Sequence, residues 1–142
     1  KVKMEYQLVP DIYSRLQTEP NKILMIDLEG QGRLQEFKKQ HERFQEHSNS
    51  FFSRNEYLEI CPKDTDKGSA VAYISQFLGV LPENTVAVGD ERNDIPMIQA
   101  AHTGVAVKNS HPDIRQAADY ITSRDSAHGA VAEVIDKFIL PI

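Results

Sequence analysis

The C-terminal part of the chain alternates short apolar runs with helix-like segments, and this alternation constrains the fold more than any other feature. The apolar runs lie at 85–88, 104–107 and 120–121. None of them alternates apolar and polar residues, so each predicts a strand that is buried on both faces. Strands of this kind, each followed by a helix, are typical of a parallel sheet covered by helices. We therefore expect an α/β fold with a parallel sheet over residues 62–142.

Helical periodicity fills the intervals around these strands. The helices are predicted at 67–78, 95–101, 112–118 and 131–139. Gly79 directly follows the first of them, and glycine is the usual residue just beyond a helix end.

The residues before Pro62 follow a different pattern. The apolar run at 23–26 predicts a buried strand, and apolar residues at helical spacing among charges predict an amphipathic helix at 31–46. Two further strands are predicted at 50–53 and 57–61, joined as a hairpin. This part is therefore expected to be a mixed α+β layer.

Composition excludes several classes of protein. Sixteen Lys and Arg against 21 Asp and Glu give a net charge of −5 without a basic stripe, which argues against a nucleic-acid partner. No apolar run approaches the roughly 20 residues of a membrane helix, and no segment looks like a secretory signal. The single cysteine, Cys61, excludes an internal disulfide and suits a reducing compartment, so we expect a cytoplasmic protein and interpret Cys61 as a small apolar residue at a strand end.

The segment 86–95 carries the chemistry. Asp90 directly follows an apolar strand, where ligands bind in parallel sheets, and Asp94 lies four residues later. A carboxylate at that place, with oxygen-rich neighbours, suits Mg²⁺ beside a phosphate. Asn93 is predicted to open the next helix, where its amide and the backbone N–H groups would bind phosphate oxygens. The alternative is that Asn93 or Asp94 only caps that helix.

Lys67 begins the helix at 67–78, where its charge has the unfavourable sign for the helix dipole. An isolated lysine there is usually a solvated surface charge. Lys67 and Asp90 nevertheless each lie at the entrance of a helix in a same-handed parallel unit, so they are expected at the same edge of the sheet. Together they favour an anion site.

These motifs together resemble the haloacid dehalogenase superfamily, in its Cof-type sugar-phosphatase branch. The most specific of them is Gly-Asp-x-x-Asn-Asp with a Lys-Gly upstream. The matching segments are 57–60, 67–68, 89–97, 104–110 and 117–119. The resemblance implies that residues 62–142 are the C-terminal part of a Rossmann-like core domain, and that residues 1–61 are the C-terminal part of an α/β cap domain.

The resemblance also implies Mg²⁺-dependent phosphomonoester hydrolysis through an aspartyl-phosphate. Lys67 would steady the nucleophile and the transferring phosphoryl group, and Asp90 would bind Mg²⁺ directly or through its waters. Asn93 would contact the phosphate. Asp94 would support the metal loop and orient Lys67. The two residues between Asp90 and Asn93 receive no role.

The family's nucleophile motif, Asp-x-Asp-Gly-Thr, is absent, and its Ser/Thr phosphate ligand is not identifiable. We therefore expect this chain to be inactive alone, with the nucleophile on a missing N-terminal segment or on a separate chain. The run at 23–31 mimics the motif, with Asp27 followed by Glu29 and with Gln31 in place of Thr. The longer Glu29 would misplace a proton donor, and displacements of about 1 Å cost roughly 10²-fold in rate. Because Asp27 also falls inside the cap-like part, we interpret it as a structural acid at a strand end.

The resemblance implies a small phosphorylated metabolite, such as a sugar phosphate, as substrate, with the cap selecting the leaving group. Two other classes stay open. A phosphomutase-type phosphotransferase would use the same Lys67 and Asp90. The other alternative is a non-catalytic binding or regulatory module.

Overall fold

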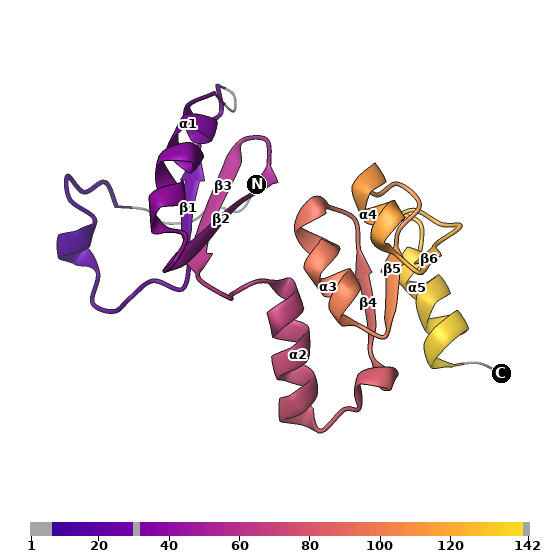
Figure 1. Cartoon of the computed structure of the whole chain (residues 1–142). Coiled ribbons are helices and arrows are strands. Elements are labelled where there is room, and N and C mark those ends of the chain that lie inside the picture. The colour runs from indigo at the N-terminus through magenta and orange to yellow at the C-terminus, as the bar shows by residue number, and fades with distance from the viewer. Residues whose placement is uncertain (1–6, 30–31, 141–142) are drawn as a thin grey trace.

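The part of the chain that the structure describes contains two separate three-stranded sheets. The computed structural model describes residues 7–29 and 32–140. One sheet is antiparallel, with the strand order β1-β3-β2, and the other is parallel, with the order β4-β5-β6 (Figure 1). The chain passes from the first sheet to the second through helix α2 (Lys67–Leu78).

The antiparallel sheet is made of β1 (Ile23–Ile26), β2 (Ser48–Arg54) and β3 (Tyr57–Pro62). The predicted strand at 23–26 is confirmed with the same bounds, but the prediction that it is buried is wrong, since three of its four residues are exposed. The predicted hairpin is confirmed with slightly longer strands. Helix α1 (Gly32–His41) packs against β2 and β3 and is shorter than predicted. Its end tightens into the 3₁₀ turn Glu42–Phe44, a common way for a helix to terminate, and the predicted first residue, Gln31, lies outside the described residues.

The parallel sheet predicted for the C-terminal part is confirmed. Its central strand β5 is covered by buried side chains of α3 and α4, among them Ile98 and Ile114. The predicted closing helix ends in a wider π-helical turn, Ile135–Ile139. The remaining elements are β4 (Val86–Gly89), α3 (Ile95–Ala100), β5 (Thr103–Ala106), α4 (Pro112–Ala117), β6 (Tyr120–Ile121) and α5 (Ala130–Val134).

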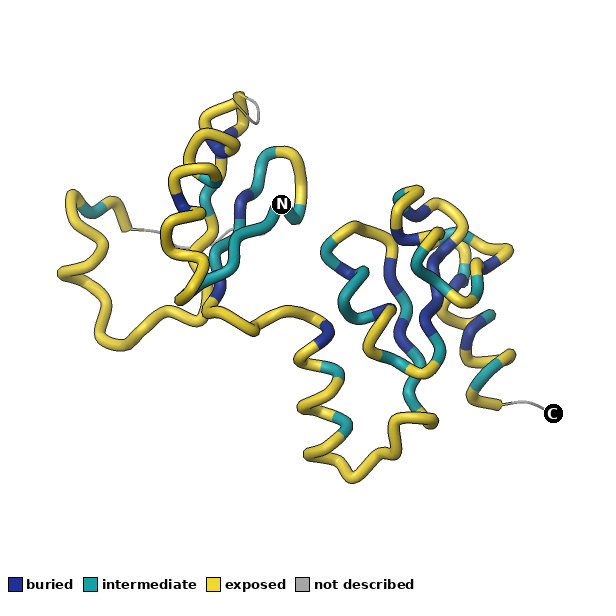
Figure 2. Tube along the Cα trace, in the orientation of Figure 1, coloured by how far each residue is buried: buried dark blue, intermediate teal, exposed yellow. Residues whose placement is uncertain are grey.

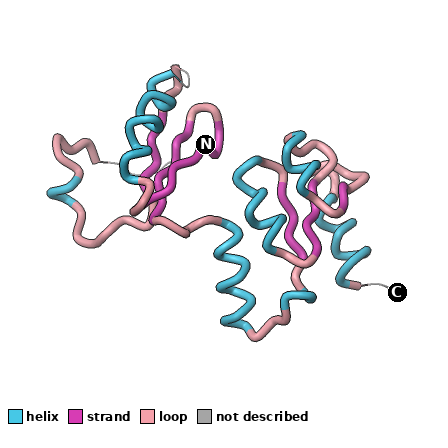
Figure 3. The backbone as a smooth tube through the Cα atoms, viewed as in Figure 1, coloured by secondary structure: helices cyan, strands magenta, loops and turns pink. Residues whose placement is uncertain are grey.

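Burial is uneven along the chain. Buried positions follow β4 and β5, whereas α2 is exposed over most of its length (Figure 2). The aromatic rings of Tyr73 and Phe77 stack on one another on the exposed face of this helix. The segment 7–22 runs out from the antiparallel sheet with little regular structure (Figure 3). None of the described helices has the length and apolarity needed to cross a membrane.

Candidate functional site

The tip of β4 is a tightly held turn. Asp90 follows the strand, and its carbonyl accepts a hydrogen bond from the N–H of His111 at 2.8 Å. The N–H groups of Asp90 and Glu91 both donate to Oδ2 of Asp94, at 3.0 and 3.1 Å. The backbone of the turn, from which the Asp90 side chain projects, is therefore fixed from two sides.

Asp94 also holds Lys67. Oδ1 of Asp94 accepts a hydrogen bond from the ammonium of Lys67, the first residue of α2. The Asp94 side chain is 6% exposed, whereas the Lys67 side chain is 50% exposed. Burial would by itself raise the pKa of Asp94, but the hydrogen bonds from Lys67 and from two backbone N–H groups outweigh it and lower the pKa. Asp94 is therefore a charged, buried anchor that leaves part of the lysine free to face a ligand.

Two glycines permit this contact. A Cβ at Gly68 would stand 2.6 Å from the carbonyl oxygen of Pro96, so only glycine lets the start of α2 approach α3 so closely. A Cβ at Gly89 would stand 2.5 Å from the Cβ of Asp94. Close packing therefore explains why glycine stands beside Lys67 and beside Asp90.

The other two predicted site residues are Asp90 and Asn93. Within residues 7–29 and 32–140, the carboxylate of the exposed Asp90 has no hydrogen-bond or ion-pair partner, and neither has the half-buried amide of Asn93. Asn93 is predicted to open the next helix. In the structure it lies instead in a short 3₁₀ turn, Arg92–Asp94, which precedes α3. Asp94 stands at the N-cap position of α3 but makes no side-chain capping hydrogen bond to that helix; its carboxylate instead accepts the N–H of Glu91, which precedes the 3₁₀ turn.

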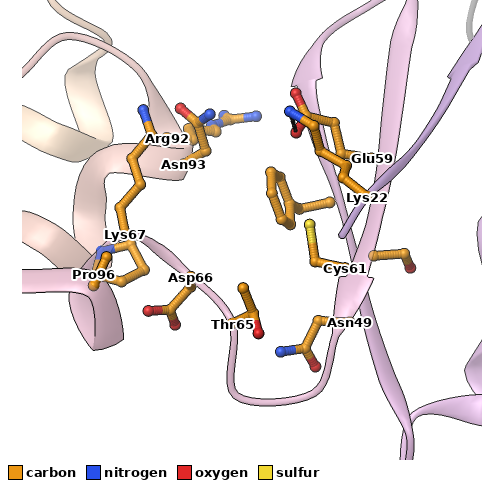
Figure 4. A pocket seen from close by; sticks show the side chains of 13 residues that line it. Lys22, Asn49, Glu59, Cys61, Thr65, Asp66, Lys67, Arg92, Asn93 and Pro96 are labelled. Atoms are coloured by element: carbon orange, nitrogen blue, oxygen red, sulfur yellow. Dashed lines mark ion pairs between the residues drawn. The ribbon is translucent and has the colours of Figure 1, made fainter. Parts of the chain in front are cut away.

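A cavity of about 650 Å³ lies between this strand tip and the antiparallel sheet (Figure 4). Lys67 and Asn93 line it from the side of the parallel sheet. Lys22 and Glu59 line it from the opposite side, where their side chains form an ion pair at 2.9 Å. The complete lining is Lys22, Asn49, Ser50, Phe51, Glu59, Cys61, Thr65, Asp66, Lys67, Ala70, Arg92, Asn93 and Pro96.

Sequence analysis missed several of these residues. The sequence pattern assigns no role to Arg92 and gives no signal for Lys22, yet both line the cavity. One signal was present, because Glu59 interrupts the otherwise apolar β3 and so had to lie on a polar face of the sheet. Cys61 is buried near the end of β3, as expected, but it also lines the cavity.

Asp27 does not lie on this cavity. It follows the end of β1 that pairs with Tyr57, whereas Lys22 precedes the opposite end, which pairs with Ile60. The guanidinium of Arg33 binds Asp27 through two nitrogens at 2.8 and 2.7 Å. Those hydrogen bonds give Asp27 a structural role. Gly30 and Gln31, the end of the motif-like run, lie outside the described residues.

A magnesium ion fits the donor chemistry of the strand tip. Asp90 offers an unpaired carboxylate, the hard oxygen ligand that Mg²⁺ prefers. Among the described residues, no three His, Cys, Asp or Glu side chains gather closely enough to hold a metal ion. Mg²⁺ usually keeps several waters and takes only one or two carboxylates. Asp90 therefore suits one ligand position rather than a complete cage.

A sequence model of haloacid dehalogenase-like hydrolases matches residues 1–135. The chain is 37% identical over 83 residues to the phosphoglycolate phosphatase of Methanothermobacter thermautotrophicus, a match that covers 58% of this chain and 37% of that protein. It is 37% identical over 82 residues to the phosphoglycolate phosphatase of Staphylothermus marinus, covering 58% of this chain and 34% of that protein. The chain thus spans about a third of the length of these curated relatives.

Solved structures agree with the sequence matches. A haloacid dehalogenase-like hydrolase from Bacteroides thetaiotaomicron has a TM-score of 0.77 and 30% identity, covering 92% of this chain and 48% of that chain. A second such hydrolase, from B. subtilis, has a TM-score of 0.77 and 26% identity, covering 92% and 46% of the two chains. The predicted fold class, an α/β core with part of an α+β layer, is confirmed.

Proposed function

The chain belongs to the haloacid dehalogenase-like hydrolase family, and we propose that it forms the C-terminal part of a Mg²⁺-dependent phosphomonoester hydrolase. The observation that carries the proposal is the contact of Lys67 with Asp94 beside the free carboxylate of Asp90. It supports the proposal because a cation, Lys67, and an amide donor, Asn93, line the cavity, and a candidate metal ligand, Asp90, follows the adjoining strand β4 without itself lining the cavity. Those are the groups that a transferring phosphoryl group requires.

In this proposal each side chain has one task. Lys67 places its positive charge against the phosphoryl oxygens, and Asn93 donates its amide N–H to another of them. Asp94 keeps Lys67 in place and fixes the backbone of Asp90. Asp90 would hold Mg²⁺, which when bound neutralises charge on the phosphoryl group. The nucleophile, which would form an aspartyl-phosphate, lies on a segment beyond this chain.

Two features support a further segment that completes the core domain. Among the described residues, β4 pairs only with β5, so its other edge has no strand beside it. Exposed sheet edges and large apolar patches are features that folded proteins usually cover. Helix α2 exposes 77% of Phe77 and 69% of Tyr73. We accordingly propose that residues 62–142 are the C-terminal part of the core domain and residues 1–61 that of the cap.

The proposed substrate is a small phosphorylated metabolite such as a sugar phosphate, and neither a nucleic acid nor a membrane is proposed as a partner. Two of the relatives are named phosphoglycolate phosphatases, which supports hydrolysis of a phosphate ester with a small leaving group. A cytoplasmic location is proposed because the lone cysteine forms no disulfide.

The test is phosphate release by the complete product of the gene, including any residues before Lys1. We expect hydrolysis of p-nitrophenyl phosphate with Mg²⁺, loss of activity in EDTA, and loss in Asp90→Asn with the fold retained. Phosphate transfer within a sugar phosphate, stimulated by a bisphosphate, would instead identify a phosphomutase. A protein that neither turns over esters nor binds Mg²⁺ and phosphate would be a non-catalytic module, and the proposal would be wrong.

A further inference from the structure

The turn that carries Asp90 is bound by the loop that follows the neighbouring strand. Strand β5 lies between β4 and β6 (Figure 1), and the β5–α4 loop comprises residues 107–111. The first N–H of this loop, that of Val107, donates to the carbonyl of Gly89 at 3.1 Å. Its last N–H, that of His111, donates to the carbonyl of Asp90 at 2.8 Å. Two donors of one loop therefore hold the backbone on either side of the Asp90 amide.

The β5–α4 loop is in turn bound to the end of β6 through Thr122. This residue directly follows β6 and is 2% exposed. Its N–H donates to the carbonyl of Ala106 at 3.0 Å, which continues the pairing of β6 with β5. Its Oγ1 accepts the N–H of Lys108 at 3.1 Å and donates to the carbonyl of Arg124 at 2.6 Å. One buried hydroxyl thus joins the loop after β5 to the loop after β6.

The other contacts between these two loops are weaker or more exposed. The N–H of Lys108 also points to the carbonyl of Arg124, but at 3.4 Å. Asn109 exchanges two hydrogen bonds with Ser126, at 3.0 and 3.1 Å, and both side chains are exposed. Water can replace an exposed hydrogen bond, whereas a buried donor or acceptor that loses its partner stays unsatisfied. The hydroxyl of Thr122 is therefore the contact between the loops whose loss should have the largest effect.

We propose that Thr122 is a positioning residue for the carboxylate of Asp90 as a Mg²⁺ ligand. This inference rests on the proposed Mg²⁺-dependent function. Thr122 acts through the β5–α4 loop, which holds the backbone from which Asp90 projects. Groups that orient a metal ligand influence the affinity for the metal. Mg²⁺ binding and the order of this loop are therefore coupled, and such coupling acts in both directions.

Thr85 makes the same two kinds of hydrogen bond at the opposite edge of the sheet. Its Oγ1 accepts the N–H of His102 at 2.9 Å and donates to the carbonyl of Pro82 at 2.6 Å. Thr85 directly precedes β4 and His102 directly precedes β5, so this hydroxyl also joins the segments beside two neighbouring strands. Asp90 lies beyond the other end of β4. Thr85 is therefore the matched control for a hydroxyl that only supports the sheet.

The test measures Mg²⁺ binding to the complete gene product by isothermal titration calorimetry. Thr122→Val removes the hydroxyl and keeps the branched shape of the side chain. It should weaken Mg²⁺ binding by about 3- to 30-fold, the range for substitutions that act through a coupled network. The Mg²⁺ concentration for half-maximal hydrolysis of p-nitrophenyl phosphate should rise by the same factor, with kcat at saturating Mg²⁺ within about twofold of the wild type. Thr122→Ser retains the hydroxyl and should bind Mg²⁺ as the wild type does.

Thr85→Val separates positioning from general support of the fold. Both valine variants lose a hydroxyl that accepts one hydrogen bond and donates another, so both should have a lower thermal midpoint. Thr85→Val should nevertheless bind Mg²⁺ as tightly as the wild type. Equal weakening of Mg²⁺ binding in the two valine variants, or no weakening in Thr122→Val, would show that Thr122 only supports the fold.

Amide hydrogen exchange in the wild type tests the coupling without a substitution, and it also decides the matter if Thr122→Val does not fold. Mg²⁺ should slow the exchange of the Lys108 and His111 amides more than that of the His102 amide. The first two belong to the loop that holds Asp90, whereas the third is bound to Thr85. Equal slowing at all three amides, or at none, would overturn the proposal.

The failure of this inference is distinguishable from that of the proposed function. A wild type that neither binds Mg²⁺ nor hydrolyses p-nitrophenyl phosphate would overturn the proposed function, and this inference would fail with it. A wild type that does both, with Mg²⁺ binding unchanged in Thr122→Val, would overturn the role of Thr122 alone.

Discussion

The two sheets contribute to one cavity in different ways. On the parallel side, the buried carboxylate of Asp94 accepts hydrogen bonds from Lys67 and from two backbone N–H groups. These three contacts hold its side chain in one position. On the antiparallel side, Lys22 meets Glu59 through a single ion pair and stays half exposed. Substitutions on the first side should therefore disrupt the geometry of the chemistry, whereas those on the second can alter ligand choice and leave the fold intact.

The largest effect is expected on the parallel side, from Lys67→Met. The variant removes the cation that faces the phosphoryl group, and kcat/KM for every ester should fall by about 10²- to 10³-fold. Lys63→Met is the matched control, since Lys63 is an exposed lysine in the turn just before α2 that does not line the cavity. Steady-state kinetics on both variants provides the measurement. Full activity in the Lys67 variant would remove the functional distinction between the two sides.

Gly89→Ala tests the close packing of the same side. The new Cβ would meet Asp94, and such overpacking costs about 1–3 kcal/mol of unfolding free energy. Activity should fall too, because Asp94 can no longer hold Lys67 in place. Gly32→Ala is the counterpart beside the antiparallel sheet, where a Cβ meets nothing within 4 Å at the start of α1. Chemical denaturation should show no loss for Gly32→Ala, and equal losses in both variants would contradict the comparison.

Asp94→Asn sharpens the comparison through pH. The pKa of Asp94 is lowered in the folded protein, so its charge stabilises the fold above its unfolded-state pKa near 4. That contribution is lost as the pH falls through the lower, folded-state pKa. The variant should be less stable than the wild type by about 1–3 kcal/mol near neutral pH. The difference should shrink on acidification. Denaturation curves over a pH series will measure it, and a difference that is independent of pH would show that the charge of Asp94 does not matter.

The smallest effect is expected from Asp27→Asn, in the antiparallel part. The variant loses the double hydrogen bond to Arg33, so its thermal midpoint should fall. Its kcat/KM should stay within about twofold of the wild type, because Asp27 does not line the cavity. A loss as large as that of the Lys67 variant would make Asp27 a participant in the chemistry after all.

Most of the secondary structure around the parallel sheet could be predicted from the sequence. Apolar runs without alternation predicted β4, β5 and β6, and the resemblance implied that Asp94 orients Lys67, two residues that the fold brings into contact. Local patterns carry that information because each residue lies at the end of its own strand or the start of its own helix. The sequence pattern does not distinguish the 3₁₀ turn before α3 from the first turn of that helix, because both are closed by local backbone hydrogen bonds.

The second wall of the cavity could not be predicted. Lys22 and Glu59 are far apart in sequence, and they meet because β1 pairs with β3 in one particular register. Their approach to Arg92 depends further on how the two sheets lie across α2. No local pattern encodes either relation, although the charge of Glu59 in an apolar strand was a partial signal.

A crystal structure of the complete gene product with Mg²⁺ and orthovanadate tests the central claim most directly. We predict the oxyanion within hydrogen-bond distance, about 3 Å, of Nζ of Lys67 and Nδ2 of Asn93, with the metal ion on the carboxylate of Asp90. An oxyanion and metal ion bound away from the tip of β4, with Lys67 still engaged only by Asp94, would contradict the account.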